Sequence, residues 1–154
     1  MPSEMLFEIE DVVMQDGGLA LNRVTSKGET WLLKRADGEP FSANSLQLQQ
    51  KLFAELALTR RYLLGVPNLS VPVHAFASDS SLCLIYEPCA CIVPDIQRKW
   101  ASAGMAWPIA DIKRLAWQLC SAVDAMHQRR VSHLALRPQV RCRSKWIDLL
   151  LAKK

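Results

Sequence analysis

The sequence predicts an α+β fold in which an antiparallel sheet comes first and helices make up most of the second half. Two observations predict it. Short runs of β-preferring residues separated by glycine turns fill the first third of the chain. Later segments repeat apolar residues at spacings of three and four, which is the period of a helix. We expect five strands, with one helix inserted after the third strand and two helices after the fifth.

The first three strands are expected to form an antiparallel meander. Gly17 and Gly18 mark the first sharp turn, because glycine adopts positive φ without steric cost. A second turn is expected at Ser26–Glu29. The predicted strands are Phe7–Met14, Leu19–Val24 and Thr30–Lys34.

One helix and a hairpin complete the predicted first half. The helical spacing runs from Ser45 to Leu64, and Gly65 and Pro67 end it. The hairpin combines Val71–Phe76 with Leu82–Tyr86. The second of these segments is apolar on both faces, which predicts a central strand.

Two helices are expected in the second half. Pro94–Ser102 forms a short helix, and Ile109–Arg130 carries a long apolar stripe preceded by a proline suited to a first turn. Glu87 and Pro88 end the fifth strand. We therefore divide the chain into residues 1–88 and 89–154.

Composition limits the class of protein and its partners. The 154 residues, 50% hydrophobic and 22% charged, suit one globular domain and argue against a disordered or fibrous chain. The net charge of +4 is mild, so we read the basic residues of the last third as a solvated face and do not expect nucleic-acid binding. Neither a leader-like start nor a membrane-length apolar run is present, which predicts a cytoplasmic or nuclear protein with no membrane partner.

Five cysteines make an odd number and show no repeated Cys-x-x-Cys spacing, which predicts reduced thiols. Cys89 and Cys91 could hold a metal only with two further ligands, and the three histidines show no zinc spacing with them. Buried apolar cysteines explain the same residues.

The segment Val131–Pro138, Val-Ser-His-Leu-Ala-Leu-Arg-Pro, resembles the catalytic loop of protein kinases, where an apolar pair precedes His-Arg-Asp-Leu-Lys-Pro. His133 stands at the structural histidine of that loop, and Leu134 and Ala135 replace its Arg and Asp. The order of predicted elements is also that of a kinase. The resemblance implies a small lobe in residues 1–88, with a five-stranded antiparallel sheet and one helix, and a partial helical large lobe in residues 89–154.

The turn Gly17-Gly18-Leu19-Ala20 resembles a divergent glycine-rich loop, with the Gly-Gly-Phe-Ala form of the Numb-associated kinase group as its nearest counterpart. In kinases this loop lets backbone N–H groups approach phosphates. A bare turn explains the same glycines. The valine that covers the adenine in kinases is either replaced here by Asn22 or lost in a short deletion.

Leu32-Leu33-Lys34 resembles the third-strand Ala-x-Lys motif, with Lys34 as the phosphate-contacting lysine. Its expected partner is Glu55 on the following helix, because a buried ammonium needs a carboxylate. Ordinary surface residues remain the alternative.

Leu84–Cys89 resembles the hinge that binds the adenine edge. The resemblance implies that Tyr86 is the gatekeeper residue, narrowing the space behind it, and that Glu87 and Cys89 offer backbone groups to the base. A buried strand ended by a proline explains these residues equally well.

Departures from the kinase pattern concern the chemistry. Ala135 cannot accept the proton of a substrate hydroxyl, a step worth roughly 10²- to 10⁴-fold in rate, and Val140 stands where a magnesium-holding Asn is expected. Asp148, followed by two leucines, resembles the metal-holding acid of the Asp-Phe-Gly motif. An amphipathic tail with an incidental Asp is the alternative.

Three functional hypotheses follow. The first is a catalytically inactive kinase-like domain that retains ATP and Mg²⁺ and acts through a protein partner or as a homodimer. The second is a Ser/Thr protein kinase, or a fragment of one. The third is an unrelated small α+β interaction domain, which would be favoured if the segments Leu19–Lys34 and Leu82–Tyr86 did not share a sheet.

Overall fold

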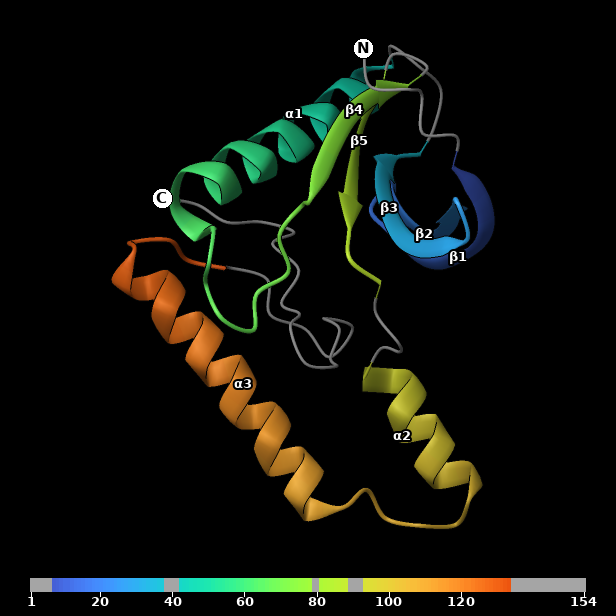
Figure 1. Cartoon of the computed structure of the whole chain (residues 1–154), viewed down its shortest axis with the longest axis vertical. Helices are drawn as coiled ribbons and strands as arrows, with labels where there is room; N and C mark the ends of the chain where they lie inside the picture. The colour runs from blue at the N-terminus through green and yellow to red at the C-terminus, as the bar shows by residue number, and fades with distance from the viewer. Residues whose placement is uncertain (1–6, 38–41, 79–80, 89–92, 134–154) are drawn as a thin grey trace. The chain divides into compact units, whose positions relative to one another are not determined.

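The computed structural model describes residues 7–37, 42–78, 81–88 and 93–133. Over these residues the fold is α+β, with five strands, three α-helices and one π-helical turn (Figure 1). The described residues form two compact units. The first contains residues 7–37, 42–57, 72–78 and 81–88, and the second contains residues 58–71 and 93–133.

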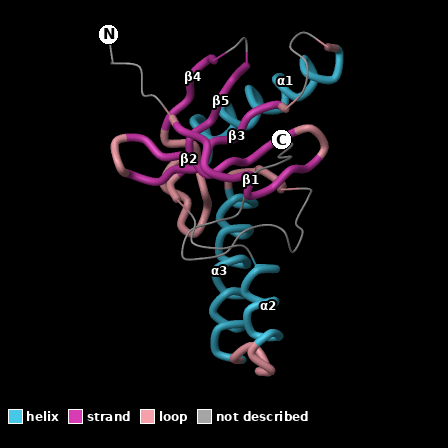
Figure 2. The backbone as a smooth tube through the Cα atoms, turned by 90° about the vertical axis from the view of Figure 1, so that its right-hand side faces the viewer, coloured by secondary structure: helices cyan, strands magenta, loops and turns pink. Residues whose placement is uncertain are grey.

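A five-stranded antiparallel sheet forms most of the first unit, as the sequence predicts (Figure 2). Its strand order is β1-β2-β3-β5-β4, so β5 lies between β3 and β4. Leu82 to Tyr86 of β5 are all buried, which confirms the predicted central strand. The strands are β1 Glu8–Asp16, β2 Leu19–Ser26, β3 Glu29–Ala36, β4 His74–Ser78 and β5 Ser81–Tyr86.

Every strand differs from its prediction at one or both ends, by one to three residues, and two of these differences have a clear cause. β1 runs on to Asp16, because Gly17 and Gly18 alone connect it to β2, with φ angles of 56° and 84°. β4 begins at His74 instead of Val71, since Pro72 has no N–H to donate to a neighbouring strand. The Val73 N–H still donates to the Ile85 carbonyl at 2.8 Å.

Register defines the two faces of the sheet, because directly paired residues project to the same side. Lys34 pairs with Leu21 on β2 and with Leu84 on β5, and this side is the helix face. Leu33 pairs with Asn22 and with Ile85, and this side is the outer face.

Helix α1, Ala43–Leu58, packs on the helix face. Its buried residues recur at spacings of three and four, and the Ser42 hydroxyl caps its first turn by accepting the Ser45 N–H at 3.1 Å. The prediction of one helix through Leu64 was wrong at its C-terminal end, because Thr59–Leu63 forms a π-helical turn. The buried residues of α1 are Ser45, Leu48, Leu52 and Glu55.

Apolar side chains cover part of the outer face. The rings of Phe7 and Phe76 stack there with their centroids 5.6 Å apart. They pack against a buried group that draws on three strands, so the sheet has apolar packing on both faces. The buried members are Val24, Leu33, Cys83 and Ile85.

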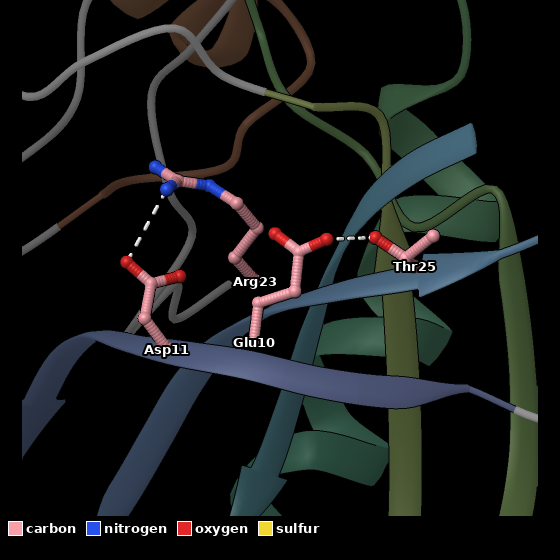
Figure 3. Close-up of polar contacts among 4 residues, drawn as sticks. All are labelled: Glu10, Asp11, Arg23 and Thr25. Carbon is pink, nitrogen blue, oxygen red and sulfur yellow. Dashed lines mark hydrogen bonds and ion pairs between the residues drawn. The ribbon is translucent and has the colours of Figure 1, made fainter. Parts of the chain in front are cut away.

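β1 lies at one edge of the sheet and carries acidic side chains there. A register shift between Ile9 and Asp11 leaves Glu10 without a partner in the strand pairing, and its carboxylate accepts a hydrogen bond from the Thr25 hydroxyl. Asp11 forms an ion pair with Arg23 at 3.2 Å (Figure 3). Charges along an edge strand discourage pairing with another chain.

The second unit contains helices α2, Val93–Ser102, and α3, Ile109–Gln128. Its core is formed by side chains from the segment that follows α1, from the C-terminal half of α3 and from the residues just after α3. α3 ends two residues before the predicted Arg130, which adopts a positive φ of 58°. None of the described helices is long and apolar enough to cross a membrane. The core residues are Leu63, Val66, Leu69, Ala122, Met126 and Val131.

Candidate functional site

Three side chains meet on the helix face: Lys34, Glu55 and Tyr86. The Lys34 Nζ lies 2.7 Å from Glu55 Oε2. The Tyr86 hydroxyl donates a hydrogen bond to the other oxygen of the same carboxylate, Oε1. The Lys34 Nζ also lies 5.9 Å from the centroid of the Tyr86 ring. We call these three residues the buried triad.

Each member of the buried triad comes from a different element of the first unit. Lys34 lies on β3, between β2 and β5. Glu55 follows Leu48 and Leu52 on the buried stripe of α1, so helical periodicity turns its carboxylate toward the sheet. Tyr86 is the last residue of β5 and pairs with Leu32, which places it on the same face as Lys34.

The triad is shielded from water. The side chains of Lys34 and Glu55 are 2% and 4% exposed. Removing two charges from water costs several kcal/mol per ion, so such a pair persists only with good geometry and further hydrogen bonds. The Tyr86 phenol supplies one such bond without adding a charge. Within the triad one ammonium therefore balances one carboxylate.

The predicted pairing of Lys34 with Glu55 is thus present in the structure. A lysine ammonium acts as a point charge that can bind phosphate oxygens. Whether Lys34 contacts a nucleotide remains a prediction. The hydrogen bond from Tyr86 was not anticipated, although a buried phenol normally finds a polar partner and so gave a usable signal.

Gly17 and Gly18 form a two-residue connection that is tied to its surroundings. The Asp37 N–H donates to the Gly18 carbonyl at 2.7 Å. A Cβ atom at Gly18 would lie 2.8 Å from Leu48 Cδ1, whereas a Cβ at Gly17 would meet nothing within 4 Å. Turn geometry and the closeness of α1 therefore account for Gly18 without a ligand.

Asn22 lies on the outer face and Leu21 lies opposite Lys34. Asn22 therefore faces away from the triad. Whether Asn22 replaces the valine of the kinase pattern or that valine is lost in a short deletion stays a prediction. Arg23 shares the helix face with Leu21, and its ion pair with Asp11 balances its charge (Figure 3).

The remaining predicted residues either are not members of the triad or lie outside the described part of the chain. Glu87 is exposed just after β5. His133 is buried in the second unit, two residues after the buried Val131. The others, Cys89, Leu134, Ala135, Val140 and Asp148, lie outside the described residues.

Within the described ranges, no group of three or more His, Cys, Asp or Glu side chains could hold a metal ion. The predicted metal ligand Asp148 falls outside these ranges. Cys83 and Cys120 are thiols, the first buried and the second exposed.

Comparison with known proteins does not assign the chain to a family. No protein-family model matches it, and no curated protein sequence matches it at a significant level. The kinase resemblance therefore rests on the motifs in the sequence.

Proposed function

We propose that the chain is a protein-kinase-like domain that binds nucleotide phosphates at Lys34 and acts by binding, without transferring phosphate. The observation that carries this proposal is the buried ion pair between Lys34 on the third strand and Glu55 on the helix inserted after it. The kinase resemblance implies such a pair, between a third-strand lysine and a glutamate of the following helix.

The surrounding sheet supports the proposal. The segments Leu19–Lys34 and Leu82–Tyr86 share one sheet, so the arrangement that would have favoured an unrelated α+β domain is not found. A buried ion pair between segments 21 residues apart is also costly to maintain for stability alone. A lysine kept charged, buried and paired is more readily explained by a ligand that needs its charge.

The sequence argues against phosphoryl transfer. Transfer depends on positioning the nucleophile and on stabilising charge with metal ions. Ala135 has no group to accept a proton, and Val140 has no donor atom for a metal. We therefore propose that the chain does not phosphorylate protein, and that an incubation with ATP, Mg²⁺ and a generic protein substrate leaves the substrate unmodified. Measurable transfer that Ala135→Asp increases would favour the Ser/Thr kinase alternative.

A role in protein binding has its own supporting observation. Three large apolar side chains on the N-terminal half of α3 are exposed: Ile109 by 71%, Ile112 by 42% and Trp117 by 68%. Exposed apolar groups of this size commonly mark interaction surfaces. A protein partner or a second copy of the chain accordingly remains part of the proposal.

Calorimetric titration of the full chain tests the nucleotide site. We expect ATP with Mg²⁺ to bind more tightly than adenosine, because Lys34 would contact phosphate and not the base. A Lys34→Met/Glu55→Gln variant, which removes both buried charges together, should lose this difference. The matched control Lys113→Met removes an exposed lysine of α3 and should keep it. Equal binding of ATP and adenosine by the unmodified chain, or no binding of either, would remove the proposed site.

A further inference from the structure

We propose that Tyr86 is a positioning residue: its hydroxyl holds Glu55 against Lys34, so that the ion pair is assembled before any ligand arrives. The hydrogen bond from Tyr86 to Glu55 joins residues 31 positions apart, at the end of β5 and on α1. It is independent of the strand pairing that places Lys34.

Geometry at the carboxylate supports this role. Oε2 of Glu55 faces the Lys34 ammonium and Oε1 accepts the Tyr86 hydroxyl. The two donors approach different oxygens, so the carboxylate cannot turn away from Lys34 without also leaving Tyr86. Because the site is dry, a broken bond here is not replaced by water.

β5 also holds α1 at a second point. The Gln49 Oε1 accepts the Leu82 N–H at 2.7 Å. The two contacts run in the same direction along both elements, from Leu82 with Gln49 to Tyr86 with Glu55. Two attachments along one strand restrain α1 from sliding or turning on the sheet, and Leu52, which is fully buried, adds packing between them.

The consequence for ligand binding rests on the proposed function. Lys34 is buried, so a phosphate could reach it only after the side chains that cover it had moved aside. It would then meet an ammonium whose counter-ion is already in place, so helix α1 need not move toward Lys34 on binding. The free-energy cost of ordering α1 would then not be subtracted from the affinity for the phosphate ligand. The chain would accordingly have no switch in which α1 moves away from Lys34.

Acylation of lysines by acetic anhydride, followed by peptide mass spectrometry, measures how often the pair opens. Tyr86→Phe keeps the ring and removes only the hydroxyl. Because a hydrogen bond to a charged group is lost, we expect Lys34 to react about ten- to a hundredfold faster in this variant. Tyr62→Phe, which alters the other tyrosine of the chain, should leave the Lys34 rate unchanged. Equal rates in the Tyr86→Phe variant and the unmodified chain would overturn the proposal.

Tyrosine NMR gives a second test that a general loss of stability would not imitate. The chain has two tyrosines, so labelling with ¹³Cζ-tyrosine gives two signals, which Tyr62→Phe assigns. We expect the Tyr86 signal to move when Glu55→Gln removes the charged acceptor, while the Tyr62 signal stays in place. An unmoved Tyr86 signal would contradict the hydrogen bond. If Glu55→Gln does not fold, the acylation of Tyr86→Phe decides the question.

The same labelling separates this inference from the nucleotide proposal. ATP with Mg²⁺ should slow acylation of Lys34 in the unmodified chain if a phosphate lies beside it. A lack of protection would count against nucleotide binding and leave the role of Tyr86 standing. Protection by ATP together with an unchanged rate in Tyr86→Phe would retain the nucleotide site and reject Tyr86 as its positioning residue.

Discussion

Leu21 lies directly opposite Lys34 on the neighbouring strand, while Asn22 projects from the other face of the sheet. Asn22 is 2% exposed, and its Nδ2 has no hydrogen-bond partner in the described part of the chain. The apolar side chain of Leu21 thus lies beside the buried triad, and the buried amide of Asn22 lies on the outer face, which carries an apolar cluster.

The buried amide predicts a stabilising substitution. Asn22→Leu keeps the approximate size of the side chain and removes an unpaired donor from an apolar setting, so we expect the free energy of unfolding to rise by about 1 kcal/mol. Urea unfolding measures this change. Asn44→Leu, at an exposed position of α1, serves as the control and should change stability by less than about 0.5 kcal/mol. A clear loss of stability in Asn22→Leu would show that the amide makes a bond that stabilises the fold.

The ion pair predicts strongly non-additive mutations. Lys34→Met alone leaves the Glu55 carboxylate buried without its counter-ion, which should cost about 3–5 kcal/mol. Lys34→Met combined with Glu55→Gln should recover much of this loss, because no unpaired charge remains. Chemical denaturation of the two single variants and the double variant measures the coupling. Additive losses would mean that the charges of Lys34 on β3 and Glu55 on α1 do not interact.

Substitution of the two glycines in the turn between β1 and β2 should lower the stability of the fold by different amounts. Gly18→Ala places a methyl group against Leu48 and forces a positive φ on a residue with a Cβ, whereas Gly17→Ala meets only the second of these costs. The backbone cost is about 1–2 kcal/mol at each position. Thermal unfolding should therefore show Gly18→Ala to be the less stable variant. Equal midpoints would indicate that the Leu48 side chain moves aside freely.

Substitutions in the two halves of helix α3 should differ in their effect on stability. Met126 is fully buried, so Met126→Ala should cost about 2–5 kcal/mol of stability. Trp117→Gln changes a side chain that is 68% exposed and should alter stability by less than about 0.5 kcal/mol. If the N-terminal half of α3 binds a second copy of the chain, sedimentation velocity should show weaker self-association in Trp117→Gln. A monomer at all concentrations, with no binding of an apolar dye, would argue against the interaction surface.

Much of the fold could be predicted because its signals are local. Glycine pairs, β-preferring runs and helical spacing each depend on residues close in sequence. They placed the five strands and three α-helices that the described residues form. The errors fell at element ends, as at Pro72 and at the π-helical turn Thr59–Leu63. The residue at which an element ends depends on hydrogen bonds and packing with segments distant in the sequence.

The sequence by itself determined the order of the elements and the presence of a lysine and a glutamate at suitable places along them. Only the tertiary structure decided that Leu21 and not Asn22 faces Lys34, because register depends on pairing between strands and a shift of one residue reverses the face. It alone brought the Tyr86 hydroxyl to Glu55, since that contact joins separate elements through packing that no local pattern encodes.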